Sequence, residues 1–121
     1  MEFSGTVIHG DAYGRTIGYP TINIDAVDYA SKGLNLKAGV YAGEVFFHTN
    51  QKKYKAAIVI SLSTGAILPK LEAHLLSYSG DCYGEVVQFM VGKFIRSYQS
   101  FQLEAELISA IVADIQKINK I

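Results

Sequence analysis

The residues best suited to chemistry begin with a loop in which glycine recurs every four positions, at Gly10, Gly14 and Gly18. Glycine leaves backbone N–H groups accessible and tolerates positive φ, which suits a loop that cradles phosphate. Arg15 lies among the glycines and would add a positive charge. The loop has neither the Gly-Lys-Ser/Thr of a Walker sequence nor the Rossmann glycine spacing. It is consistent with a phosphate-binding loop, or with an ordinary hairpin turn whose arginine lies in solvent.

Two neutral oxygen ligands follow this loop. Pro20 fixes the entry to an extended segment that carries Thr21 and Asn23. Residues two apart on a strand point to the same side, so these two side chains would face one place. Mg²⁺ prefers oxygen ligands, and phosphate groups are bound by N–H groups together with a cation. The pattern therefore predicts a site for a metal-bound polyphosphate.

A second candidate lies on the alternating segment from Lys70 to Leu76. The apolar residues at 71, 73 and 75 would face one side of a strand, whereas Glu72 and His74 would face the other. Glu72 has the chemistry of a general base that accepts a proton from a substrate hydroxyl. The plainer alternative is a half-exposed strand with both polar side chains in water. The three histidines have no metal-ligand spacing.

The elements that must position these residues are mostly strands. Runs of β-branched and aromatic residues alternate with clusters of Gly, Asn, Asp, Ser or Pro, as in antiparallel connections. The expected strands span residues 3–9, 20–24, 39–47, 54–62, 71–76 and 83–94. The segment Asp25–Lys37 is polar without a strong pattern, and we expect a loop there.

Near the C-terminus the pattern becomes that of one amphipathic helix. Apolar residues recur there at Leu103, Leu107, Ile108, Ile111, Val112, Ile115 and Ile118. Ser100 is the expected N-cap, with Glu104 and Glu106 near the start of the helix and Lys117 and Lys120 near its end. The apolar stripe must be buried against the sheet. Six strands and one helix predict a mainly β fold, a small antiparallel barrel or sandwich with an external helix.

Composition narrows the possible functions. The chain of 121 residues predicts one domain, and eleven basic against eleven acidic residues argue against a nucleic-acid or membrane surface. The single cysteine, Cys82, excludes an intramolecular disulfide and is expected to be an incidental thiol. Neither a signal peptide nor an apolar run of about 20 residues is visible. We expect a cytoplasmic monomer.

Taken together, these residues resemble the riboflavin kinase family. Gly14–Asn23 resembles the family's glycine-arginine-glycine pattern followed by Pro-Thr-Ala-Asn, and Leu71–Leu76 resembles its Glu-x-His strand. Further motifs follow in the family's order: Gly39-Val40-Tyr41, Asp81-Cys82-Tyr83-Gly84, Phe94-Ile95-Arg96, Phe101 and Asp114. The resemblance extends from Gly5 to Ile115, and its specificity comes from the number of motifs in order.

The resemblance implies a six-stranded antiparallel Greek-key barrel with a C-terminal helix. It implies transfer of the γ-phosphoryl group of ATP to the 5′-hydroxyl of riboflavin, with Mg²⁺ as cofactor, to give FMN and ADP. Glu72 would be the catalytic base, and Thr21 and Asn23 would hold the metal. The implied nucleotide-binding residues are Gly10, Gly14, Arg15, Gly18, Pro20, Thr21 and Asn23. Arg96, Tyr98 and Phe101 would lie beside the flavin.

Three departures from the family pattern leave alternatives open. The segment Ser61–Pro69 lacks the family's Gly-x-Asn-Pro-Thr-like loop, Ile22 replaces an alanine, and Tyr98 stands where glutamate is common. A flavin- or nucleotide-binding module without catalysis is one alternative, and a related kinase for another small alcohol is the other. In many bacteria this kinase domain forms the C-terminal half of a bifunctional FAD synthetase, whose adenylyltransferase domain has no counterpart in this sequence.

Overall fold

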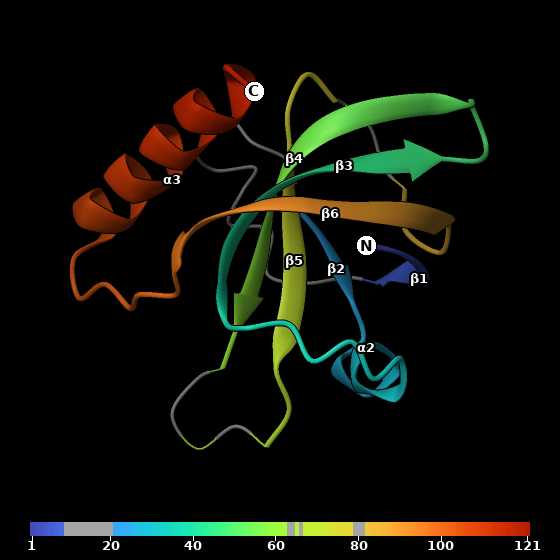
Figure 1. The fold of residues 1–121 in the computed structure, drawn as a ribbon, viewed down its shortest axis with the longest axis horizontal. Helices are drawn as coiled ribbons and strands as arrows, with labels where there is room; N and C mark the ends of the chain where they lie inside the picture. The colour runs from blue at the N-terminus through green and yellow to red at the C-terminus, as the bar shows by residue number, and fades with distance from the viewer. Residues whose placement is uncertain (9–20, 63–64, 66, 79–81) are drawn as a thin grey trace.

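Six antiparallel strands close into a barrel, and one long helix lies outside it (Figure 1). The computed structural model describes residues 1–8, 21–62, 65, 67–78 and 82–121. The strands are β1 (Glu2–Ile8), β2 (Thr21–Ile24), β3 (Gly39–Phe47), β4 (Lys52–Ser61), β5 (Lys70–Leu75) and β6 (Val86–Ser97). The helices are α2 (Ala26–Ser31) and α3 (Glu104–Asn119). The expected mainly β barrel with a C-terminal helix is thus confirmed.

The strand order around the barrel is β1-β2-β5-β4-β3-β6, with β6 closing onto β1. Strands β3, β4 and β5 follow one another as antiparallel neighbours, and β6 returns to pair with β3. This is a Greek-key arrangement. It also brings β2 beside β5, so that residues 53 positions apart in the sequence become hydrogen-bonded neighbours.

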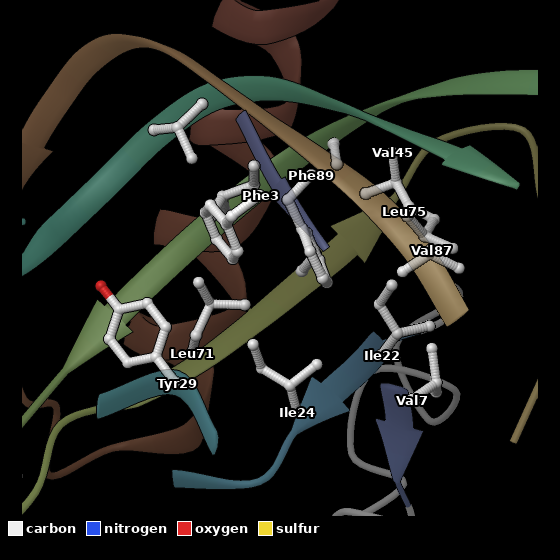
Figure 2. Close-up of a cluster of buried hydrophobic side chains, with 14 of the residues drawn as sticks. Phe3, Val7, Ile22, Ile24, Tyr29, Val45, Leu71, Leu75, Val87 and Phe89 are labelled. Carbon is white, nitrogen blue, oxygen red and sulfur yellow. The ribbon is translucent and has the colours of Figure 1, made fainter. Parts of the chain in front are cut away.

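The inside of the barrel is filled by apolar side chains from every strand. Phe3 and Phe89 stack with ring centroids 5.2 Å apart, and Leu71 on β5 is fully buried beside them in the same cluster. Figure 2 shows Phe3, Leu71 and Phe89 in this cluster together with Ile22 and Ile24 of β2. The inward position of residues 71, 73 and 75 confirms the alternation expected for β5.

Helix α3 covers part of the outer surface of the barrel (Figure 1). Its residues Ile111, Ile115 and Ile118 are buried in a second cluster with Val40 and Ala57 of strands β3 and β4. The apolar stripe predicted from the sequence therefore does face the sheet. Ile108 and Val112 of the stripe are only half-buried, and Leu103 is 61% exposed just before the helix begins.

An ion pair also fastens α3 to the barrel. Nε and Nη2 of Arg96, near the end of β6, donate to the two carboxylate oxygens of Asp114 at 2.9 and 2.8 Å. Asp114 is buried, and the Arg96 side chain is 25% exposed. Two parallel bonds to one carboxylate fix orientation as well as distance, so this pair helps to fix the position of α3 relative to the end of β6.

The segment Asp25–Lys37 contains a helix where a loop was expected. The Asp25 carboxylate accepts hydrogen bonds from the backbone N–H groups of Val27 and Asp28, each at 3.1 Å, and so caps α2. The prediction was wrong because α2 has six residues, too few to display a helical period. Its one buried side chain, Tyr29, packs on Phe3 at the barrel core.

Two boundaries also differ from expectation. Helix α3 begins after Leu103, which makes no side-chain capping bond, so Ser100 is not its N-cap. Residues 98–103 instead connect the end of β6 to the helix. The last strand begins at Val86, because Gly84 takes a φ of +83° that interrupts the strand predicted from Tyr83. Within the described residues, no helix is both long and apolar enough to cross a bilayer.

The Arg96–Asp114 pair leads to a prediction about stability. We expect Asp114→Asn to lower the free energy of unfolding by about 2–3 kcal/mol, somewhat less than for a fully buried pair because Arg96 is partly exposed. Urea denaturation followed by circular dichroism measures this change. The matched control is Glu106→Gln, an exposed residue of the same helix, expected to cost less than about 1 kcal/mol. Equal midpoints for Asp114→Asn and the wild type would show that the pair does not anchor the helix.

Candidate active site

A cavity of about 290 Å³ lies between the outer face of the barrel and the C-terminal part of the chain. One wall is formed by strands β2, β3, β4 and β5, and the other by the end of β6, residues 98–101 and helix α3. The lining residues are Thr21, Val40, Ala57, Val59, Ser61, Glu72, His74, Arg96, Tyr98, Gln99, Ser100, Phe101, Leu107, Ile111 and Asp114. The volume is near the lower end of small-molecule pockets, roughly 300–1,000 Å³.

The pairing of β2 with β5 brings the polar residues of the first wall together. Thr21 lies directly opposite His74, and Asn23 lies opposite Glu72. Directly opposed residues on antiparallel strands have Cβ atoms about 4.5–5.5 Å apart and point to the same face. Ile22 and Ile24 point into the barrel core, so Thr21 and Asn23 face outward together, as the sequence predicts.

The side chain of Asn23 has a buried oxygen that needs a partner. The residue is 4% exposed, and its Oδ1 accepts no hydrogen bond from any described residue. A buried acceptor without a partner costs free energy, roughly 1–3 kcal/mol, unless a ligand or ion satisfies it. A hard cation would do so, because amide and hydroxyl oxygens are its natural ligands.

The donor set narrows the kind of metal that this place could hold. Across the described part of the chain, no three His, Cys, Asp or Glu side chains are grouped as metal ligands. The described residues alone therefore do not assemble a zinc-type site. Mg²⁺ keeps several waters and is often completed by substrate phosphates, so the neutral oxygens of Thr21 and Asn23 fit it.

Glu72 places a carboxylate at the edge of the same cavity. Its side chain is 21% exposed, and its Oε2 lies 4.0 Å from Nζ of Lys70. On the other neighbouring strand it lies opposite Val59, an apolar residue that also lines the cavity. The half-exposed strand considered from the sequence is thus not an ordinary solvated face. Glu72 is accessible to a ligand in the cavity, and His74 beside it is 6% exposed.

The second wall contains the three residues expected beside a flavin. Arg96, Tyr98 and Phe101 all line the cavity. Tyr98 is 36% exposed, and the Arg96 guanidinium lies 5.9 Å from the centre of the Phe101 ring. Arg96 spends two donors on Asp114 and a third on the Ser97 carbonyl at 3.3 Å. The observed contacts of Arg96 therefore join the end of β6 to helix α3 and so hold this wall of the cavity together.

The other expected nucleotide-binding residues, Gly10, Gly14, Arg15, Gly18 and Pro20, lie outside the described residues. Two features of the site were not anticipated from the sequence. One is the role of Asp114, which could have been suspected as the single acidic residue within the buried stripe of α3. The other is the hydrogen bond of 3.0 Å between Thr21 Oγ1 and His74 Nδ1, which depends on strand register.

Comparison with known proteins identifies the family to which the chain is similar. The family described as Flavokinase, riboflavin kinase, matches residues 1–121. Bifunctional riboflavin kinase/FMN adenylyltransferase from Mycoplasma pneumoniae is 34% identical over 116 residues, which cover 96% of this chain and 40% of that protein. The Escherichia coli K12 protein of the same description is 38% identical over 115 residues, covering 94% of this chain and 36% of its relative.

Solved structures show the same similarity. Riboflavin kinase from Trypanosoma brucei superposes with a TM-score of 0.68 at 26% identity, over 98% of this chain and 77% of that one. A structure described as a macrolide-efflux protein from Streptococcus pneumoniae gives a TM-score of 0.79 at 27% identity, over 98% of this chain and 38% of the other. The chain spans about two fifths or less of the curated relatives named above. With its whole length matched by the family and its barrel shared with a solved member, the chain belongs to the riboflavin kinase family.

Proposed function

We propose that this protein transfers the γ-phosphoryl group of ATP to the 5′-hydroxyl of riboflavin, giving FMN and ADP. The observation that carries the proposal is the register of β2 and β5, which sets Glu72 opposite Asn23. A carboxylate base and a neutral oxygen ligand then lie side by side on the outer face of the two strands, where Glu72 and Thr21 line the cavity. Membership in the riboflavin kinase family supports the same substrates.

In this proposal, different residues of the site carry out different parts of phosphoryl transfer. Phosphoryl transfer depends mainly on positioning and on neutralising charge. Mg²⁺, when bound, would neutralise charge on the phosphate oxygens, and we propose that Thr21 and Asn23 hold it. Glu72 accepts the proton of the attacking hydroxyl, so the oxygen gains nucleophilic character as it approaches the phosphorus. The glycine loop at residues 10–18, with Arg15, would bind the nucleotide phosphates through its N–H groups.

The flavin would lie along the second wall. An isoalloxazine ring is flat and largely apolar, and it stacks well on aromatic rings. Tyr98 and Phe101 supply such rings, and Leu107 of α3 adds an apolar surface in the same cavity. This arrangement would direct the ribityl chain toward Glu72 on the facing strand. We propose that Arg96 helps to hold this wall in place.

One assay separates this function from its two alternatives. The protein is incubated with riboflavin, ATP and Mg²⁺, and FMN is resolved by chromatography. FMN formation supports the kinase. Binding of flavin, with or without nucleotide, but no FMN would indicate a module that has lost catalysis. ATP binding without affinity for riboflavin would indicate a kinase for another small alcohol.

The proposal extends to the setting of the protein. The named relatives are bifunctional, and this chain matches a segment of them. We propose that this chain carries the kinase step and acts as a monomer in the cytoplasm. Size-exclusion chromatography and cell fractionation test those two points. An elution volume of a dimer, or recovery with membranes, would contradict them.

Removal of the base is the first test. We expect Glu72→Gln to keep the fold and to lower kcat by about 10²–10⁴, because the amide no longer accepts the hydroxyl proton. Initial rates at saturating riboflavin and Mg·ATP measure this effect. The control is Glu44→Gln on β3, which does not line this cavity and should leave kcat unchanged. A kcat near that of the wild type in purified Glu72→Gln would remove Glu72 from the mechanism.

Asn23 provides a test that links stability to metal binding. Leucine is close to asparagine in shape and has no buried acceptor. We therefore expect Asn23→Leu to leave the free energy of unfolding of the metal-free protein unchanged, or to raise it by up to roughly 2 kcal/mol. The same variant should bind Mg·ADP at least tenfold more weakly by calorimetry, because loss of even a hydrogen-bond partner of a metal ligand weakens metal binding by about 10–100-fold. The exposed Asn119→Leu should bind normally, and intact Mg·ADP binding by Asn23→Leu would contradict the metal assignment.

A further inference from the structure

His74 is one of four buried polar or charged residues among those described, and the reaction scheme above does not use it. Its Nδ1 lies 3.0 Å from Oγ1 of Thr21, within ordinary hydrogen-bond distance. The two residues are directly opposed across β2 and β5, and both line the cavity. His74 therefore contacts one of the two residues assigned to the metal.

The surroundings of His74 fix the position of the imidazole. On its other side the ring lies opposite Ala57 of β4, whose methyl group leaves room for it. Ala57 is packed against Ile111 and Ile115 of α3, and Leu76, two residues after His74, is buried in the same cluster. Packing on this side holds the ring beside Thr21, with Nδ1 3.0 Å from the hydroxyl oxygen.

The direction of this hydrogen bond decides what the Thr21 hydroxyl offers to a ligand. A threonine hydroxyl has one proton and two lone pairs, and a neutral imidazole has one donor and one acceptor nitrogen. If Nδ1 donated, it would occupy a lone pair of Oγ1 and leave the hydroxyl proton facing the ligand. If Nδ1 accepts, this bond uses the hydroxyl proton and no lone pair of Oγ1, so the bond itself does not block coordination of a cation.

We propose that His74 is a positioning residue whose Nδ1 accepts the Thr21 hydroxyl proton, so that Oγ1 presents lone pairs to the metal of the bound nucleotide. This inference rests on the proposed function, in which Thr21 binds Mg²⁺. His74 would then orient Thr21, which coordinates the metal, without touching the metal itself. Loss of such a partner typically weakens metal affinity by about 10–100-fold.

The first test measures the ring directly and needs no activity. Long-range ¹H–¹⁵N spectra of the uniformly labelled wild-type protein distinguish protonated from unprotonated ring nitrogens. We expect Nε2 of His74 to be protonated and Nδ1 to be unprotonated. The chain has three histidines, so the spectra of His48→Leu and of the variants below assign the signals. A protonated Nδ1 would overturn the proposal.

The second test uses a matched pair of substitutions. His74→Leu removes the acceptor, and we expect it to raise the Kd for Mg·ADP by about 10–100-fold in calorimetry. His74→Asn places an amide oxygen near the position of Nδ1, so its Kd should rise by less than about tenfold. Circular dichroism confirms that both variants are folded. The exposed His48→Leu serves as control and should bind as the wild type does.

The outcomes separate this inference from the proposed function. A wild type that forms FMN, together with a His74→Leu variant of normal Mg·ADP affinity, would overturn the positioning role and leave the kinase intact. Equal Kd values for His74→Asn and His74→Leu would also overturn it, since the acceptor would then be irrelevant. A wild type that forms no FMN would refute the kinase, while the spectra would still report the direction of the Thr21–His74 bond.

Discussion

Strand β2 pairs with β5 in a register that sets Asn23 opposite Glu72 and Thr21 opposite His74. The rest of the site depends on this pairing. Strand β2 has four residues, and a shift of one position would turn Thr21 and Asn23 into the barrel and Ile22 and Ile24 out of it. Burial of the two isoleucines in the core therefore fixes the register, and the register in turn places the polar groups.

The second wall of the cavity depends on a different set of forces. Helix α3 is held on the barrel by an apolar stripe and by the bidentate Arg96–Asp114 pair. Burial of the apolar stripe holds the helix against the sheet, but such contacts are not directional and tolerate small shifts of the helix along the sheet. The ion pair adds direction, because its two bonds require one orientation of guanidinium and carboxylate. The apolar stripe and the ion pair together therefore determine the position of the aromatic residues at 98 and 101.

Much of this arrangement is readable in the sequence, for physical reasons that can be named. Alternation along residues 70–76 identifies which side of β5 is buried, because the strand period is two. The helix of residues 104–119 is evident because its stripe spans several turns. The six-residue helix α2 and the start of α3 are not evident, since neither has a strong local signal. The Thr21–His74 bond and the Arg96–Asp114 pair depend on tertiary register, which single-sequence periodicity does not contain.

The alternation of β5 has an evolutionary consequence. Leu71, Ala73 and Leu75 point into the barrel, whereas Glu72 and His74 lie at the cavity outside it. Residues that pack in the core thus alternate along one short strand with residues that face the cavity. The interior can be repacked by drift at every second residue without altering the reacting groups. Selection for a different acceptor can act on the intervening residues while the barrel keeps its core.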